Sequence, residues 1–188
     1  KIFEKQRNDI KNSTQMFNEE DFIILRDIYS KNDFGFYYLV MHKESLYLFM
    51  MKKFDKSIVN EKDIQREIEF CQHSHRCFTP FYGFLMEKEY HNMTGLIYEF
   101  MSNGSLKSFV KENKFDEINN DIYLLMTINR IYEGIKYLHD KSFVHRDLKP
   151  SNILINHNNL AFISDFETIR SVDSSDPFTA YVGSPLYT

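Results

Sequence analysis

The 188-residue chain contains no tryptophan, six glycines, four prolines and two cysteines. Cys71 and Cys77 alone cannot build a disulfide framework, so we expect a reducing, cytoplasmic environment. No uncharged stretch reaches the roughly 18 apolar residues that a transmembrane helix needs. The opening residues also lack the apolar segment of a signal peptide. These absences exclude a secreted disulfide scaffold and predict no membrane span.

The chain also has no excess of positive charge, with 23 basic against 27 acidic residues and a net charge of −4. A general nucleic-acid binder is therefore not expected, because phosphate contacts need clustered lysines and arginines. Hydrophobic residues make up 43% of the chain, which is enough for a packed core. The length leaves room for one domain or two small ones.

Apolar runs in the first half of the chain indicate a β-rich region. They predict strands at residues 22–28, 34–42, 46–51, 81–85 and 96–100. Ile64, Ile68 and Cys71 recur at helical spacing and predict one helix over residues 58–71. Residues 1–21 are polar and of mixed charge, and we expect a lead-in or a short helix there.

The second half carries a stronger helical signal. Apolar residues recur every three or four positions: Ile122, Leu125, Ile128, Ile131, Ile135 and Leu138. They predict a long helix over residues 121–139 with one buried stripe. Two short apolar runs, 153–155 and 160–163, flank a turn of polar residues and predict a hairpin. This order of elements favours an α+β fold.

One stretch concentrates polar groups suited to chemistry. It reads His145-Arg146-Asp147-Leu148-Lys149-Pro150-Ser151-Asn152, and Asp165-Phe166 follows thirteen residues after Asn152. This pattern resembles the catalytic loop of the eukaryotic protein kinases, H-R-D-x-x-x-x-N, followed by their D-F-G motif. The Lys149-Pro150 pair is the form typical of serine/threonine kinases.

The resemblance implies a role for each polar group. Asp147 would hold the substrate hydroxyl and accept its proton, and Lys149 would place a cation beside the moving phosphoryl group. Asn152 and Asp165 would offer Mg²⁺ the hard oxygen ligands that it prefers. Arg146 would receive an activation-loop phosphate in a bidentate grip.

The same resemblance extends back through the first half. The family's glycine-rich loop falls on residues 30–37, where Gly35 alone of the three glycines is present. Lys52 stands fifteen residues beyond Tyr37, in the position of the lysine that binds the α- and β-phosphates. Lys53 is the alternative, and on a strand only one of the two can face inward.

Further nucleotide contacts are implied in the helix, the hinge and the first strand of the hairpin. Glu67 would pair with the lysine, whereas Glu61 and Glu69 are expected to be solvated. Residues 99–101 would form the hinge, whose Glu99 and Met101 would bind the adenine edge, although an ordinary strand and turn is the alternative there. Leu154 would also line the nucleotide pocket. The family's hydrophobic spine would be a stack of Cys71, Tyr82, His145 and Phe166.

Three departures from the family pattern leave a second interpretation open. Ser30 and Asn32 replace glycines, Tyr37 and Met50 replace the small residues beside adenine, and Glu167 replaces the glycine of D-F-G. A pseudokinase scaffold with an occluded adenine pocket, or a nonfunctional kinase fragment, would explain them. Against this, all six polar catalytic positions carry the expected residue type: Lys52, Glu67, Asp147, Lys149, Asn152 and Asp165.

Residues 165–188 resemble an activation segment, in which 183–188 match the family's G-T-P-x-Y-x and Ser184 fills the hydroxyl position. Candidate phosphoacceptors are Ser171, Ser174, Ser175 and Thr179. Since the match stops there, we expect a piece of a longer kinase, inactive by itself and with an exposed apolar patch on the 121–139 helix. The set Cys71-x-His73-x-His75-x-Cys77 matches no common zinc spacing.

Together these observations predict a two-lobed α+β protein-kinase-like fold with a β-rich N-lobe and a truncated helical C-lobe. The expected segments are a lead-in at 1–21, an N-lobe at about 22–98, a hinge at 99–101 and a partial C-lobe at 102–188. The expected reaction uses ATP and Mg²⁺ to phosphorylate Ser or Thr of protein substrates. An upstream activating kinase is a candidate partner, and neither nucleic acid nor membrane is expected to be one.

Overall fold

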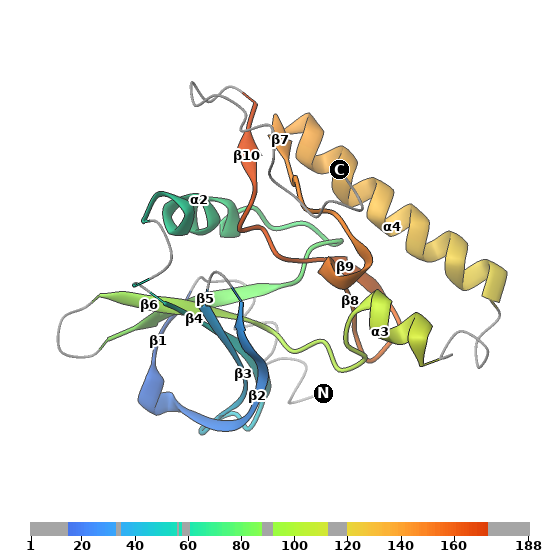
Figure 1. Cartoon of the computed structure of the whole chain (residues 1–188). Helices are drawn as coiled ribbons and strands as arrows, with labels where there is room; N and C mark the ends of the chain where they lie inside the picture. Colours follow the sequence, from blue (N-terminus) through green and yellow to red (C-terminus); the bar gives the residue numbers. More distant parts are fainter. Residues whose placement is uncertain are drawn as a thin grey trace. The chain divides into compact units, whose positions relative to one another are not determined.

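The computed structural model describes residues 15–32, 35–55, 57, 61–87, 92–112 and 120–172. The chain, drawn in Figure 1, divides into two compact units. Each unit has its own core. Unit 1 comprises residues 1–64 and 80–100, and unit 2 comprises residues 65–79 and 101–188. The expected N-lobe at 22–98 would include residues 65–79, and these boundaries stay a prediction.

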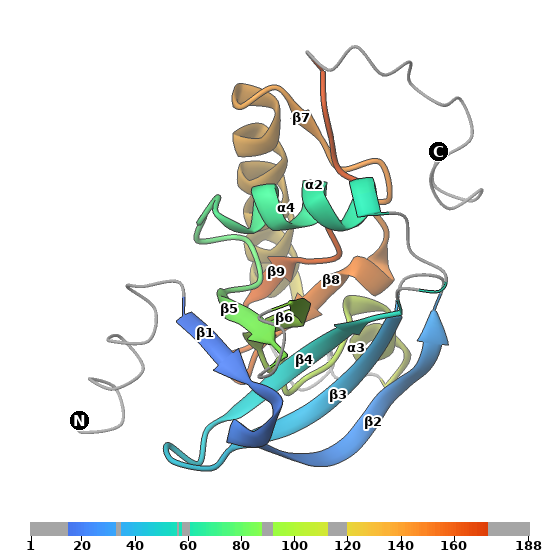
Figure 2. The same cartoon turned by 90° about the vertical axis from the view of Figure 1, so that its left-hand side faces the viewer.

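Unit 1 is built around a six-stranded sheet (Figure 2). Its strands, in spatial order, are β1 (Gln15–Asn18), β5 (Phe81–Met86), β6 (Met93–Glu99), β4 (Leu48–Phe54), β3 (Gly35–His42) and β2 (Phe22–Asn32). All neighbours are antiparallel except β1 and β5. The five predicted strands are confirmed, although the third begins at Leu48 because Leu46 adopts a positive φ of 59° in the preceding turn.

Strand β1 replaces the expected lead-in or short helix at residues 15–18, and residues 1–14 lie outside the described part. Phe17 is buried and its neighbour Met16 is exposed, the alternation of a strand. A short 3-10 turn, η1 (Glu19–Asp21), then leads into β2. The hydrogen bonds that fix β1 come from β5, some 65 residues further along, so local sequence could not reveal them.

The core of unit 1 packs against one face of this sheet. It consists of Phe17, Phe22, Val40, Phe49, Met51, Tyr82, Leu85 and Ile97. Its rings meet at angles, with centroids 5.4 Å apart for Phe17 and Phe22 and 5.1 Å for Phe49 and Tyr82. Because strand residues alternate, the burial of Phe49 and Met51 here places Met50 and Lys52 on the opposite face.

Unit 2 is mainly helical, with short strands between the helices. Its elements are the last turns of α2 (Glu61–Cys71), α3 (Leu106–Lys111), α4 (Asn120–Asp140), β7 (Phe143–Val144), η2 (Pro150–Asn152), β8 (Ile153–Ile155), β9 (Ala161–Ile163) and β10 (Arg170–Ser171). The predicted 58–71 helix is present from residue 61, and residues 58–60 lie outside the described part. Helix α3, capped by the Ser105 hydroxyl at the Ser108 N–H, was not predicted.

Helix α4 packs its buried stripe against β9 and β7, but this stripe is not the predicted one. Its amino-terminal half buries Tyr123 and Thr127, whereas Ile122, Leu125 and Ile128 are 58%, 66% and 53% exposed. The prediction was therefore wrong in register there. The carboxyl-terminal half follows it, with Leu138 buried and Ile131 and Ile135 partly buried against the same core. The same three exposed residues form the apolar patch that was also expected on this helix.

The predicted hairpin is confirmed as β8 and β9, paired antiparallel. The Asn156 side-chain oxygen accepts hydrogen bonds from the Asn158 and Leu160 amides at 3.0 and 2.9 Å. Asn159 takes the left-handed conformation with φ of 58°. Asparagine is well suited to both roles, which is why the turn could be predicted from the sequence. Across the described residues, no helix is long and apolar enough to cross a membrane.

Candidate active site

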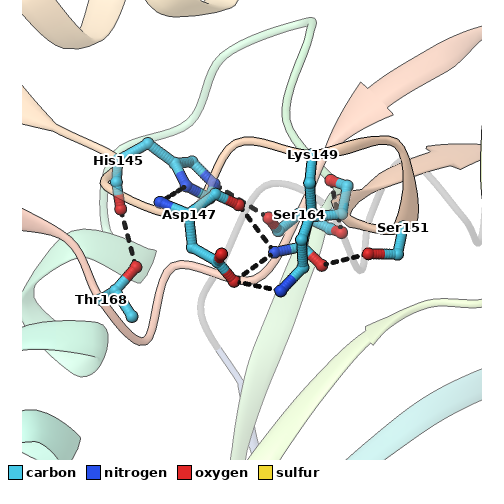
Figure 3. A network of polar contacts seen from close by, with 7 residues as sticks. His145, Asp147, Lys149, Ser151, Ser164 and Thr168 are labelled. Atoms are coloured by element: carbon cyan, nitrogen blue, oxygen red, sulfur yellow. Dashed lines mark hydrogen bonds and ion pairs between the residues drawn. The ribbon is translucent and has the colours of Figure 1, made fainter. Parts of the chain in front are cut away.

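The loop between β7 and η2 holds the Asp147 carboxylate between two donors (Figure 3). The Lys149 ammonium donates to Asp147 Oδ2 at 2.6 Å. The Asn152 side-chain amide donates to the same oxygen at 3.0 Å and to the Asp147 carbonyl at 2.9 Å. Charge-assisted hydrogen bonds of this kind are among the stronger ones in proteins. The sequence-predicted residues Asp147, Lys149 and Asn152 are thus brought together in one network.

A second set of bonds joins this loop to the segment that carries Asp165. The backbone amide and the hydroxyl of Ser164 both donate to the Asn152 carbonyl at 2.9 Å. Ser164 directly follows β9 and precedes Asp165, so these two bonds hold the start of the Asp165 segment on Asn152. Asp165 itself has a positive φ of 64°, which is unusual for a non-glycine residue.

His145 is buried at the centre of this network. Its Nε2 lies 3.0 Å from the Ser164 carbonyl, and its Nδ1 lies 3.4 Å from the Asp147 amide. A carbonyl can only accept, so Nε2 carries the proton and Nδ1 accepts from the amide. Burial lowers the pKa of His145 below its ordinary value of 6.5, against the opposing effect of the Ser164 carbonyl. The imidazole is therefore neutral near pH 7.

Arg146 contacts the segment after Asp165 through its guanidinium. Arg146 Nε donates to the Thr168 carbonyl at 2.8 Å, and the Thr168 hydroxyl donates to the His145 carbonyl at 2.8 Å. Arg146 also has a positive φ, of 67°. Arg146 and Asp165 thus both adopt the left-handed backbone conformation, and such residues cluster at functional sites. The activation-loop phosphate expected at Arg146 stays a prediction.

Aromatic packing fixes the residue that follows Asp165. The Phe166 ring lies 4.5 Å from that of Phe70, 5.1 Å from Phe78 and 5.3 Å from His145, centroid to centroid. His145 and Phe166 are in contact but tilted at 54° and not stacked, and Phe70 adds a ring that the sequence did not single out for this group. The parts of Cys71 and Tyr82 in the spine stay predictions.

In unit 1, Lys52 lies on the sheet face opposite the core. It is 2% exposed, and its ammonium stands 5.7 Å from the ring centre of Tyr37 and 5.8 Å from that of Phe54. Lys53 points to the other face and forms a half-exposed ion pair with Glu19 at 2.7 Å. Only one of the two lysines is buried, as strand geometry required, and it is Lys52.

Met50 lies on the same face as Lys52. Its cross-strand neighbours are Leu39 on β3 and Tyr98 on β6. Met50 is partly buried, so this face carries apolar bulk at the position where the family has alanine.

The acidic residues of α2 differ sharply in burial. Glu67 is 4% exposed, whereas Glu69 is exposed and bonds Gln65 on the same helix at 3.2 Å. The Glu61 side chain lies outside the described part. Among the described candidates, Glu67 is the buried carboxylate, and its pairing with Lys52 stays a prediction.

Gly35 is required for backbone packing. It begins β3 with φ of +154°, and a Cβ atom there would collide with the Lys53 carbonyl oxygen on the neighbouring strand. The structure therefore gives this glycine a packing role, and a phosphate-binding role stays a prediction. Residues 33–34 and the side chains of 29–32 lie outside the described part.

The predicted hinge residues lie where the chain passes from unit 1 to unit 2. The Glu99 amide donates to the Pro80 carbonyl at 2.9 Å, and its carboxylate accepts from the Tyr82 hydroxyl at 3.4 Å. Met101 is buried, and its carbonyl accepts from the Gly104 amide at 3.1 Å. Leu154 faces away from the core that buries its two β8 neighbours.

Comparison with known proteins decides the family. Residues 31–188 match the protein kinase domain. The chain belongs to the protein kinase family. It is 27% identical over 169 residues to MAP3K epsilon protein kinase 2 of Arabidopsis thaliana, covering 87% of this chain and 12% of that protein. It is 36% identical over 159 residues to mitogen-activated protein kinase kinase 1c of Physcomitrium patens, covering 79% and 43%.

A third relative matches a shorter part of this kinase. Ephrin type-B receptor 2 of Gallus gallus is 43% identical over 94 residues, covering 48% of this chain and 9% of the receptor. The chain therefore spans less than half the length of each of these curated relatives. Family membership establishes the α+β protein-kinase fold.

The two histidines of the cysteine and histidine set pack on aromatic rings. His73 stacks on Phe70 with centroids 5.5 Å apart, and His75 stacks on Tyr137 at 4.6 Å. Cys77 is buried, which raises the pKa of its thiol. Within the described ranges, no group of three or more histidine, cysteine or acidic side chains could hold a metal ion.

Two residues that bond the loop of residues 145–152 were not predicted from the sequence. Ser164 and Thr168 both bond the catalytic loop, at the Asn152 and His145 carbonyls. Ser164 directly precedes Asp165, which is the one sequence feature that could have drawn attention to it. Serine and threonine hydroxyls form hydrogen bonds with many backbone groups, so the residue type alone does not predict a bond to a particular carbonyl.

Proposed function

We propose that this chain is part of a protein serine/threonine kinase that transfers the γ-phosphoryl group of ATP to protein hydroxyls. The observation that supports this most directly is the Asp147 carboxylate, which receives both the Lys149 ammonium and the Asn152 amide. The Lys149-Pro150 pair supports the choice of Ser and Thr as acceptors, because it is the form typical of that class.

In the proposed reaction the substrate hydroxyl oxygen forms a bond to the γ-phosphorus while the bond from that phosphorus to the bridging oxygen breaks and ADP leaves. Asp147 orients the hydroxyl and takes its proton. Lys149, 2.6 Å from Asp147, supplies positive charge beside the phosphoryl oxygens. Since little covalent chemistry is required of the protein, positioning of these groups accounts for most of the catalysis.

The donor set fits Mg²⁺. Asn152 and Asp165 offer amide and carboxylate oxygens, and the Asn152 nitrogen is already committed to Asp147, which orients its oxygen away from that bond. The two bonds from Ser164 to the Asn152 carbonyl keep both segments together. When bound, Mg²⁺ would neutralise charge on the phosphate oxygens.

The resemblance to protein kinases suggests nucleotide-binding roles for several further residues. The buried Lys52 would bind phosphate oxygens, supported by Glu67, and Gly35 would lie in the loop over the phosphates. Glu99 and Met101 would bind the adenine edge through backbone groups, with Leu154 lining the pocket. Arg146 would receive a phosphate placed on the activation segment by an upstream kinase.

One observation favours a second candidate, a pseudokinase scaffold. Met50 adds bulk to the sheet face that carries Lys52, between Leu39 and Tyr98. If this side chain blocks adenine, the protein would show no thermal shift with ATP and Mg²⁺, and Met50→Ala would create one. Methionine is flexible, so we expect a shift in the unmodified protein.

The test is transfer of radiolabelled phosphate from ATP to protein substrates by the full-length protein. Asp147→Asn is expected to lower the rate at least about a hundredfold, the usual contribution of a positioned proton acceptor. Asp140→Asn is the matched control, because Asp140 lies on α4 in an exposed pair with Lys136. Equal rates in the Asp147→Asn variant and the unmodified protein would refute the assignment.

A further inference from the structure

Thr168 contacts the catalytic loop twice, three residues after Asp165. Its hydroxyl donates to the His145 carbonyl at 2.8 Å, and its own carbonyl accepts from Arg146 Nε at 2.8 Å. Figure 3 shows the first of these contacts, where the Thr168 side chain points at the His145 backbone. The two bonds run in opposite directions between the same segments, so relative sliding of the segments breaks at least one of them.

Both segments joined in this way contain a costly backbone conformation. Arg146 and Asp165 have φ values of 67° and 64°, which residues with a Cβ atom rarely adopt. Such conformations persist only where the surroundings over-determine them. The bonds of Thr168 connect the segment of Asp165 to the segment of Arg146 and so constrain both.

Packing supplies the rest of this constraint. Phe166 is held between Phe70 and His145, and the Ile169 amide donates to the Phe166 carbonyl at 3.1 Å, closing a turn. Glu167, within that turn, is 4% exposed and stands where the family has glycine. A residue other than glycine has fewer backbone conformations available, so the turn is built to hold one arrangement.

We propose that Thr168 is a positioning residue for the phosphotransfer reaction. Its hydroxyl and carbonyl hold residues 165–169 on residues 145–147, and thereby keep the Asp165 carboxylate where it would hold Mg²⁺. This inference rests on the proposed function of Asp165. Thr168 acts on Asp165 through the backbone, by its two bonds to residues 145 and 146.

A purely structural hydroxyl would change the stability of unit 2 and nothing else. A positioning residue changes the concentration of Mg²⁺ needed for activity, because a misplaced Asp165 binds the metal less well. It also changes local opening, which hydrogen exchange at the amides of residues 166–169 reports without any need for activity. These two readouts separate the roles.

The experiment compares Thr168→Val, which is nearly isosteric but lacks the hydroxyl, with Thr168→Ser, which retains it. Thr94→Val is the matched control, since the Thr94 hydroxyl also donates to a carbonyl, that of Leu85, within the sheet of unit 1. In the full-length protein, Thr168→Val is expected to raise the half-maximal Mg²⁺ concentration about three- to tenfold, the factor that one hydrogen bond represents. Faster amide exchange at residues 166–169 should accompany it.

Thr168→Ser and Thr94→Val should leave both readouts within about twofold, a change smaller than that of one ordinary hydrogen bond. If Thr168→Val does not fold, Thr168→Ala removes the same hydroxyl without adding a methyl group. Unchanged Mg²⁺ dependence in a folded Thr168→Val or Thr168→Ala variant overturns the proposal. If the unmodified protein transfers no phosphate, the proposed function fails, and the exchange rates still decide whether Thr168 holds the turn: unchanged rates overturn that too.

Discussion

Lys149 and Asp147 form an ion pair of 2.6 Å within one loop, although only one residue separates them. Their side chains are 24% and 13% exposed, so both charges are largely removed from water. A pair of this kind adds little net stability, because desolvation offsets the attraction. The pair is therefore better explained by the position it gives the Asp147 carboxylate.

From the Lys149–Asp147 ion pair we predict that Lys149→Met lowers activity far more than it lowers stability. Loss of the ammonium should lower phosphate transfer about a hundredfold or more, as expected for a preorganised charge. Circular dichroism melting should show a far smaller effect, because Asn152 still donates to Asp147. A variant with full activity would show that the ion pair is incidental.

The two adjacent lysines of β4 give a matched pair of substitutions. Lys52→Met should abolish measurable ATP binding by the full-length protein, because it removes the buried ammonium. Lys53→Met should change ATP affinity less than about twofold, since it removes only the half-exposed pair with Glu19. Isothermal titration with ATP and Mg²⁺ measures both, and the reverse order of effects would assign the role to Lys53.

The buried His145 makes stability depend on pH. Its folded-state pKa lies below the value of 6.5 that the unfolded chain shows, so the unfolded state binds more protons as the pH falls. The free energy of unfolding should therefore decrease as the pH is lowered through 6.5. Above that pH the contribution of the neutral imidazole is complete. Chemical denaturation at pH 7.5 and 5.5 measures the difference.

His145→Gln is the control for that prediction, because glutamine can donate to the Ser164 carbonyl but does not titrate. The difference in unfolding free energy between pH 7.5 and pH 5.5 should be smaller in this variant than in the unmodified protein. An identical pH dependence in both would mean that other groups, such as His75, whose pKa burial also lowers, account for it.

Gly134 sets how closely α4 approaches β9. A Cβ atom there would come 2.6 Å from Ile163 Cδ1 and 3.3 Å from the Cys77 Cβ. Gly134→Ala should thus destabilise the protein by about 1–3 kcal/mol despite the better helix propensity of alanine. Leu125→Ala, on the exposed side of α4, should change stability by less than about 0.5 kcal/mol. Increased stability of Gly134→Ala would contradict the packing.

The sequence predicted the parts of the molecule whose signals are local. The strands of the sheet show runs of apolar residues, and the β8–β9 turn is built from asparagines that bond their own backbone. The catalytic loop was recognisable because its polar residues stand at fixed spacing, and Asp147, Lys149 and Asn152 are brought together in the structure.

Features that depend on distant partners could not be predicted. Strand β1 exists because β5 pairs with it, and the buried face of α4 is fixed by the ring of Tyr123 stacking on Phe109 at 5.7 Å. The exposed face of α4 carries Ile122, Leu125 and Ile128, whereas the buried face includes Thr127, so apolar periodicity selected the wrong face there. The contacts of Thr168 likewise join segments more than 20 residues apart.

The most direct test of the account is binding of ATP with and without Mg²⁺, measured by calorimetry on the full-length protein and on Asp165→Asn. We predict Mg²⁺-dependent binding to the unmodified protein and a loss of that dependence in the variant. Absence of binding at saturating ATP, or equal Mg²⁺ dependence in both proteins, would contradict the assignment of this site to phosphotransfer.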